Sequence, residues 1–220
     1  MKFWARQLWW FSLCFWVACA PTAPTSQTLV IYHTSDVHGH MASRPATWHR
    51  PNPQRIIGGY AALANLIAKE KHPTLLLDSG DFFQGTPEGT LTKGQASVAL
   101  MNQLQYDAVA VGNHEYDLGE PVLRDLAEQA QFPFLAANIE RKKDKKPVTY
   151  AQPTLTRTVG GIRIGIVGLA THETSLTTMP RLVNHLNFTN EVEAAKKYAT
   201  QLRKAGAQVI IALTHCGAAA

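Results

Sequence analysis

GNHEYD, at positions 112–117, follows YDAVAV, at positions 106–111, with no linking residue between them. Residues 108–111 form a continuous apolar run, which is typical of a buried strand in a sheet that is covered on both faces. Four polar side chains come directly after this run: Asn113, His114, Glu115 and Asp117. The stretch therefore predicts a core strand that ends in a cluster of groups able to bind metal or to transfer protons.

Similar apolar runs recur along the chain and alternate with segments of helical periodicity. The predicted strands are Leu29–His33, Thr74–Leu77, Ala108–Val111, Phe134–Ala136, Arg163–Gly168 and Val209–Thr214. Helical spacing of apolar residues is found in the segments 58–71, 94–105, 119–131 and 190–206. Alternating strands and helices predict an α/β fold, in which helices cover the faces of a largely buried sheet.

The composition is that of an ordinary globular protein. Of the 220 residues, 45% are hydrophobic and 17% are charged, which allows a sizeable core and about one domain. The formal net charge of +5 rests largely on Lys2, Arg6 and the run RKKDKK at positions 141–146. This run has no interleaved aromatic residues, so it favours a solvated turn between two strands over a nucleic-acid groove. No nucleic-acid polymer is expected as a partner.

The N-terminal residues are expected to direct export rather than to join the fold. A basic start precedes the short apolar run LWWFSLCFWVACA, which is typical of a signal peptide over residues 1–18, although a buried helix is the alternative. Ordinary cleavage after Ala20 would place Pro21 at the mature N-terminus, which is unfavourable. WVAC resembles a lipoprotein box ending at Cys19, except that Trp16 stands where an aliphatic residue is usual.

These features predict a periplasmic protein or one held by a lipid on Cys19 at the bacterial cell envelope. A Pro/Thr/Ser-rich tether over residues 19–28 would follow, and a single domain would occupy residues 29–220. The chain has three cysteines, and two of them lie in or next to the leader. Only Cys216 then belongs to the domain, so no disulfide framework is expected.

Each polar cluster of the domain follows a predicted strand. TSDVHGH (34–40), SGDFFQGTP (79–87), GNHEYD (112–117) and THCG (214–217) all stand at such positions. Active sites of α/β sheets form beyond the carboxyl ends of the strands, where neighbouring loops converge. Six side chains are therefore expected to lie close together: Asp36, His38, Asp81, Asn113, His114 and His215.

These side chains are suited to divalent metal ions. Carboxylate and imidazole ligands bind ions of the Mn, Zn, Mg or Co class, and the lack of paired thiolates argues against a structural zinc site. A carboxylate such as Asp81 can bridge two ions through its two oxygens. Each motif is weak by itself, because a lone Asp-x-His or Gly-Asp is common and a lone histidine is more often structural. The four motifs together, each at a strand end, argue against chance.

The chain resembles the exported 5′-nucleotidase branch of the calcineurin-like metallophosphoesterases, which also contains UDP-sugar hydrolases and 2′,3′-cyclic-nucleotide phosphodiesterases. The resemblance rests on the motifs above and on FPFLAANI (132–139), GIRIGIVGLAT (161–171) and IIALTHCG (210–217). It implies the N-terminal part of a four-layer αββα sandwich. It also implies hydrolysis of a small phosphate ester, most often a nucleotide, by a hydroxide that two divalent metal ions activate.

The resemblance also implies a role for each site residue. Asp36 and His38 would hold the first ion, Asp81 would bridge, and Asn113 and His215 would hold the second. His114 would face the phosphate as a catalytic residue, and Asp117 would orient its ring. Glu115 is interpreted as a local structural residue. Residues 84–87 are expected to shape the loop beside Asp81.

The sequence also departs from this family. Family members continue with a Gly-His-x-His motif that completes the metal sites, and with a C-terminal domain that binds the base, whereas this sequence ends at Ala220. The hypothesis that follows is a truncated chain, incomplete at its C-terminus and weakly active or inactive. Two alternatives stay open, a periplasmic sulfur-oxidation hydrolase of the same fold and a non-catalytic, lipid-tethered fragment.

Overall fold

The computed structural model describes residues 27–217. The predicted signal peptide, Cys19 and most of the predicted tether therefore lie outside the described residues. Among the residues described, no helix combines the length and apolar character that crossing a bilayer requires.

The first sheet is parallel and has four strands. Their order is β1–β4–β5–β6, formed by Val30–Thr34, Thr74–Asp78, Ala108–Ala110 and Phe134–Leu135. Leu75, Leu76 and Leu77 of β4 are all buried, as expected for a strand with both faces covered. All four strands were predicted from their apolar runs, with bounds that differ by one or two residues.

The second sheet has the order β11–β9–β8, with strands Val209–His215, Ile162–Ala170 and Thr154–Val159. β11 is parallel to β9, whereas β8 is antiparallel to it. Two small antiparallel pairs complete the strands: β2 (Arg44–Pro45) with β3 (Ile56–Ile57), and β7 (Ile139–Arg141) with β10 (Leu186–Phe188). Residues 142–146 form an exposed turn after β7, as predicted for the basic run.

Four helices match the segments of helical spacing: α1 (Tyr60–Ile67), α3 (Gln95–Gln103), α4 (Glu120–Gln129) and α7 (Glu191–Lys204). The bounds of α7 follow from the residues at its two ends. The Asn190 side chain accepts a hydrogen bond from the Glu193 N–H at its start, and acidic residues fill the first turn and basic residues the last. Four shorter elements lie in loops: α2 (Pro87–Leu91), η1 (His114–Tyr116), α5 (Thr174–Thr177) and α6 (Pro180–Val183).

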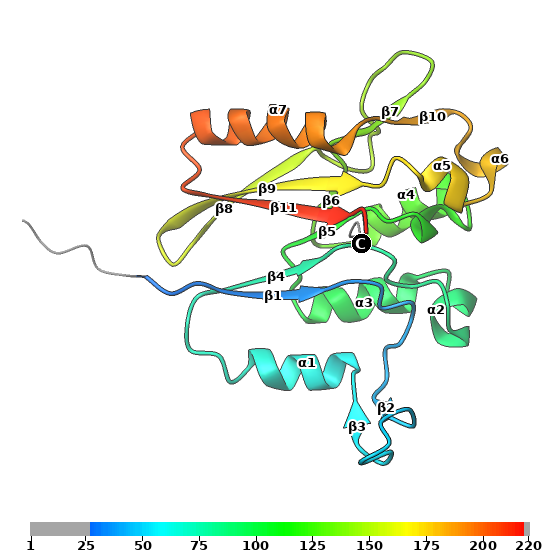
Figure 1. The fold of residues 1–220 in the computed structure, drawn as a ribbon, viewed down its shortest axis with the longest axis vertical. Helices are drawn as coiled ribbons and strands as arrows, with labels where there is room; N and C mark the ends of the chain where they lie inside the picture. The colour runs from blue at the N-terminus through cyan, green and yellow to red at the C-terminus, as the bar shows by residue number, and fades with distance from the viewer. Residues whose placement is uncertain (1–26, 218–220) are drawn as a thin grey trace, which may run out of the picture.

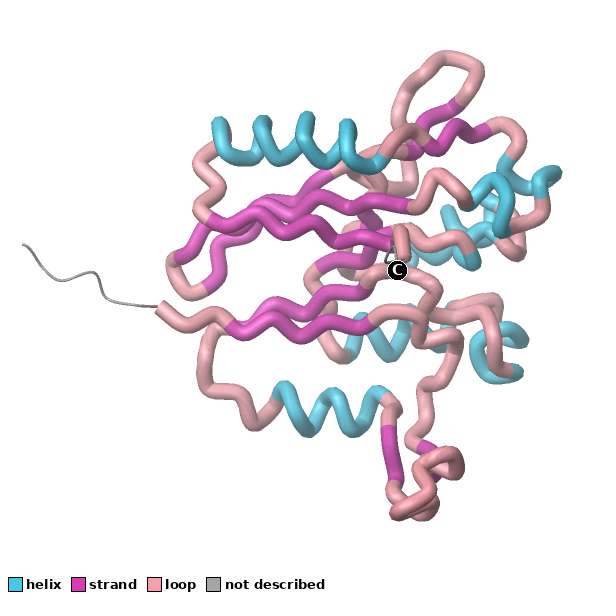
Figure 2. The backbone as a smooth tube through the Cα atoms, in the orientation of Figure 1, coloured by secondary structure: helices cyan, strands magenta, loops and turns pink. Residues whose placement is uncertain are grey.

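The two sheets pack face to face between layers of helices (Figures 1 and 2). Leu75 and Leu77 of β4 pack with Ile164 and Ile166 of β9 in the core between the sheets. On the other face of the first sheet, Leu76 joins an aromatic-rich core with side chains of α1, α3 and α4. The remaining faces of β9 and β11 pack against α7. The structure thus confirms the α/β class and shows the four αββα layers.

β1, β4, β5 and β11 point in the same direction, and their carboxyl ends meet at one end of the molecule (Figure 1). The loops after these four strands carry the predicted site residues. The fold therefore brings together segments that lie far apart in the sequence.

Candidate metal centre

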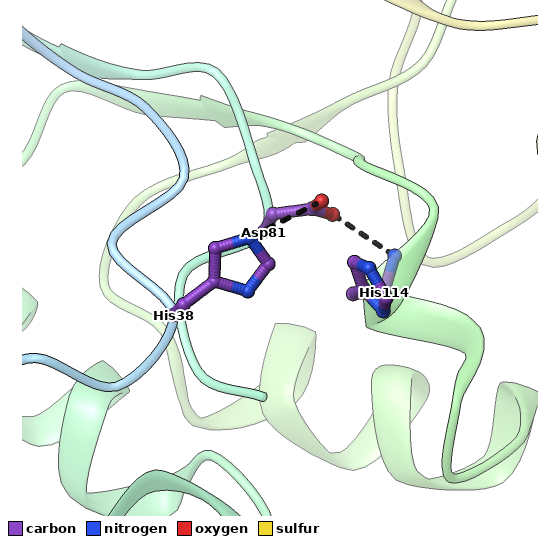
Figure 3. Close-up of side chains that lie close together, drawn as sticks. All are labelled: His38, Asp81 and His114. Atoms are coloured by element: carbon purple, nitrogen blue, oxygen red, sulfur yellow. Dashed lines mark hydrogen bonds and ion pairs between the residues drawn. The ribbon is translucent and has the colours of Figure 1, made fainter. Parts of the chain in front are cut away.

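Asp81 lies at the centre of the site. Its side chain is buried, and its Oδ2 atom is 3.2 Å from His215 Nε2 and 3.9 Å from His38 Nε2. Its Oδ1 atom accepts a hydrogen bond of 2.9 Å from the His114 backbone N–H. Figure 3 shows the Asp81 carboxylate between His38 and His114. This position suits a carboxylate that serves two neighbouring ions.

Two groups of donor atoms share Asp81. One comprises His38, Asp81 and His114, and the other comprises Asp36, Asp81 and His215; within each group the donor atoms lie within 4.8 Å of one another. Asn113 joins the second group, because its Oδ1 lies 3.1 Å from His215 Nε2. Six of the seven predicted site residues thus belong to these two groups. The seventh, Asp117, is hydrogen-bonded to His114, so all seven lie together.

The two histidines on either side of Asp81 are held in an orientation that suits metal ligands. His38 donates its Nδ1 proton to the Gln84 carbonyl at 2.7 Å, and His215 donates its Nδ1 proton to the Ser79 carbonyl at 3.0 Å. Both Nε2 atoms then face Asp81. Metal-binding histidines usually hold their second nitrogen in this way, because the hydrogen bond fixes the tautomer and the ring orientation. The residues therefore fit divalent ions.

His114 forms a pair with Asp117. Its Nδ1 lies 2.6 Å from Asp117 Oδ2, and its ring centroid lies 5.2 Å from that of His38 in an edge-to-face arrangement. A histidine held by a carboxylate can act as a metal ligand or as an acid–base group, and this pairing suits both roles. The ring also borders an open cavity of about 360 Å³, which is lined by Asn113, His114, Thr171, Glu173, Thr177 and His215 among others.

The backbone is strained at three of the candidate ligands. Asp36, His38 and Asp81 have φ values of 54°, 49° and 59°, in the left-handed region that non-glycine residues seldom adopt. Such strain persists where the surrounding structure imposes it, and it is concentrated at functional sites. Asp and His are among the residues that tolerate this conformation best, so the same side chains satisfy both the backbone and the proposed ligand set.

The loops after β4 and β5 touch each other through glycines. Gly80 has a φ of 101°, and a Cβ at this position would lie 2.5 Å from the Gly112 nitrogen. A Cβ at Gly112 would overlap Asp81 Oδ1. The first residue of GNHEYD is therefore a glycine because the carboxylate of Asp81 occupies the space of a side chain.

Glu115 ties the same two loops together. It is fully buried, and its carboxylate accepts hydrogen bonds from the backbone N–H groups of Gly112, Asp81 and Phe82 at 2.7, 2.8 and 3.1 Å. The prediction that Glu115 is structural agrees with these contacts. Residues 84–87 also shape the adjacent loop, because Gln84 holds His38 and Thr86 caps α2.

The charges of the site interact strongly. Burial disfavours the protonated form of His215, but the hydrogen bond and the charge of Asp81 outweigh this and raise the pKa of His215 to about 9. Burial raises the pKa of Asp81, but the hydrogen bond and the charge of His215 outweigh burial, so the net shift of this pKa is downward. Burial raises the pKa of Glu115 to about 8. A metal ligand must be a neutral imidazole, so metal binding at His215 would release its proton.

Three partners of the site were not predicted from the sequence. The carbonyls of Gln84 and Ser79 hold the two histidines, and the hydroxyl of Thr178 donates to Asp117 Oδ1 at 3.0 Å. Backbone carbonyls carry no sequence signal of their own. Thr178 lies 61 positions from Asp117, in a loop for which no motif was recognised.

The family comparison agrees with the fold. The calcineurin-like phosphoesterase family matches residues 29–219. Snake venom 5′-nucleotidase from Crotalus adamanteus is 39% identical over 207 residues, which cover 91% of this chain and 35% of that protein. Human 5′-nucleotidase is 36% identical over 199 residues, which cover 86% of this chain and 34% of that protein. The chain thus spans about a third of the length of the curated relatives it matches.

Solved structures give the same result. The 5′-nucleotidase precursor from Thermus thermophilus superposes with a TM-score of 0.76 and 32% identity, covering 86% of this chain and 37% of that one. The sulfate thiohydrolase SoxB has a TM-score of 0.76, but at 19% identity over 89% of this chain and 45% of that one it shows a shared fold alone. By the extent of the family match and by its similarity to the 5′-nucleotidases, the chain belongs to the calcineurin-like phosphoesterase family.

Proposed function

We propose that this chain hydrolyses small phosphate esters, nucleotides above all, with two divalent metal ions held by Asp36, His38, Asp81, Asn113 and His215. The observation that carries the proposal is the position of Asp81 Oδ2 between His38 Nε2 and His215 Nε2. Membership of a phosphoesterase family and similarity to proteins named 5′-nucleotidase support the choice of reaction and substrate.

In the proposed reaction, some side chains would bind the metal ions and others would act on the phosphate ester. Asp36, His38, Asp81, Asn113 and His215 would hold the ions. The carbonyls of Gln84 and Ser79 keep the rings of His38 and His215 in place. His114 stands at the cavity with Asp117 behind it, where it can stabilise charge on the phosphoryl group or give a proton to the leaving oxygen. Bound ions would supply Lewis-acid activation of water and of the phosphoryl oxygens.

The experiment is a substrate panel with the purified chain. Nucleoside 5′-monophosphates, a 2′,3′-cyclic nucleotide, a UDP-sugar and a thiosulfate-derived conjugate are each incubated with Mn²⁺, Zn²⁺, Co²⁺ or Mg²⁺, and with a chelator. Phosphate release from a nucleotide that stops in the chelator is the expected result. Cleavage of the thiosulfate-derived conjugate alone would contradict the nucleotide proposal and favour a sulfur-oxidation hydrolase. A protein that binds metal but cleaves none of these compounds would contradict the proposal.

Replacing His114 by Asn separates catalysis from metal binding. If His114 is the catalytic group, we expect kcat to fall by about 100-fold, the lower end of what a positioned acid–base group contributes, with metal content unchanged. The measurements are initial rates and metal content by mass spectrometry. His185→Asn is the matched control, because His185 lies away from the site in a pair with Glu120. Loss of one metal ion in His114→Asn would show instead that His114 is a ligand.

We also propose that Cys19 carries a lipid which holds the protein at a bacterial envelope. The proposal rests on WVAC and on the Pro/Thr/Ser-rich stretch that follows. Expressed in a Gram-negative host, the chain is expected in the membrane fraction, with a mature N-terminus at Cys19 that carries acyl mass. Cys19→Ser is expected to lose both properties. An unlipidated mature protein in the soluble periplasmic fraction would favour an ordinary signal peptide.

A further inference from the structure

Thr178 reaches the site from the loop after β9. Its side chain is largely buried, and its hydroxyl donates a 3.0 Å hydrogen bond to Asp117 Oδ1. The other oxygen of the same carboxylate, Oδ2, pairs with His114 Nδ1 at 2.6 Å. Three residues thus form a continuous chain of hydrogen bonds that ends at the His114 ring beside the cavity.

The backbone around Thr178 is fixed by local contacts. Its N–H donates to the Thr174 carbonyl at 3.1 Å, which closes α5. Thr174 is fully buried, and its hydroxyl donates to the Thr171 carbonyl at 2.8 Å. Thr171 follows directly on β9, so the loop begins at a core strand. The Thr178 hydroxyl is therefore presented to Asp117 by a well-supported turn.

We propose that Thr178 is a positioning residue for the His114–Asp117 pair, an inference that rests on the proposed function. A carboxylate with one bonded oxygen can still turn about its Cβ–Cγ bond, whereas a second bond on the other oxygen fixes its plane. The plane of Asp117 in turn sets the direction of the His114 ring. Thr178 therefore acts on the reaction through Asp117, without touching the substrate.

A hydroxyl on Oδ1 also keeps water from competing for the carboxylate. The Asp117 side chain is 22% exposed and that of His114 is 34% exposed, so solvent reaches both. A valine at position 178 keeps the shape of the threonine but offers no donor. The carboxylate would then turn towards solvent, and the ring would spend less time in its productive orientation.

Three variants test the proposal by kinetics. Thr178→Val is expected to lower kcat by about tenfold, a size in keeping with the loss of a hydrogen bond to a charged group, with KM within about twofold of wild type. Thr178→Ser retains the hydroxyl and is expected to restore kcat. Thr200→Val on the exposed face of α7 removes a hydroxyl that, among the described residues, bonds to the Lys196 carbonyl alone, and it is the control. A Thr178→Val enzyme with wild-type kcat would overturn the proposal.

A double-mutant cycle with Asp117→Ala shows whether Thr178 acts through Asp117. Residues that act in one chain are non-additive, so Thr178→Val is expected to have no further effect once Asp117 is absent. A second tenfold loss in that background would show that Thr178 acts independently of Asp117 and would overturn the proposal. If Thr178→Val does not fold, Thr178→Ala takes its place in the cycle.

A spectroscopic measurement keeps this inference separate from the proposed function. The Nδ1 proton of His114, bonded to Asp117, should give a low-field proton resonance that disappears in His114→Asn. In Thr178→Val this resonance is expected to shift and to exchange faster with water, whereas Thr200→Val leaves it unchanged. A wild-type protein without hydrolase activity would contradict the proposed function. An unchanged resonance in Thr178→Val would contradict the role of Thr178.

Discussion

Replacing Asp81 by Asn is expected to remove bound metal and to lower turnover more than any other single change at the site. In the wild type, Oδ2 faces His38 and His215 while Oδ1 accepts the His114 N–H. An amide has one acceptor oxygen, so the substituted side chain can serve either the metal or His114. Metal ions supply several kcal/mol of transition-state stabilisation, and about 1.4 kcal/mol is a factor of ten, so we expect a loss of more than about a thousandfold.

The measurement pairs metal content with steady-state rates. Asn is the right substitution because it tolerates the left-handed backbone that Asp81 adopts, at a φ of 59°, so folding is expected to survive. Asp125→Asn is the matched control, since Asp125 is exposed on α4. An Asp81→Asn protein that keeps two metal ions and wild-type kcat would show that Asp81 is not the bridging ligand.

The strands that carry this site could be predicted because their apolar runs are unambiguous. Residues 108–111 were predicted as a strand, and β5 spans Ala108–Ala110. β9 is longer than predicted, since it extends from Ile162 to Ala170. β7 and β10 were not predicted, because neither Ile139–Arg141 nor Leu186–Phe188 is a continuous apolar run, and the two pair across a long separation in sequence. Local periodicity contains no information about such a pairing.

The positions of the candidate ligands could be predicted for a topological reason. Parallel strands that share a direction bring their following loops to one end of the sheets, whatever their separation in sequence. The partners that orient these side chains could not be predicted in the same way. The Gln84 and Ser79 carbonyls, which hold His38 and His215, illustrate the difference. The same limit applies to the fold, because the Asn138 side chain bonds both the N–H and the carbonyl of Ala170 at the end of β9, and the sequence marks it only as part of FPFLAANI.

Glu115 is the residue whose removal is expected to destabilise the site most. Glu115→Ala leaves three buried N–H groups without an acceptor, those of Gly112, Asp81 and Phe82. Each unsatisfied buried group costs about 1–3 kcal/mol, so we expect the free energy of unfolding to fall by about 4 kcal/mol. Glu115→Gln keeps one acceptor oxygen and is expected to lose less. Urea denaturation, followed by circular dichroism, gives both values.

The variant also tests how the two loops are joined. Because Glu115 bonds the Asp81 N–H directly, its loss should weaken metal binding even under conditions where the variant remains folded. Glu128→Ala, on the exposed face of α4, is the control for removal of a carboxylate. If the free energy of unfolding of Glu115→Ala lies within about 1 kcal/mol of the wild-type value, ordered water must satisfy the three N–H groups. The strained Asp81 loop would then be held by its remaining contacts, which include the hydrogen bonds from the Asp36 and His38 N–H groups to the Gly80 and Asp81 carbonyls.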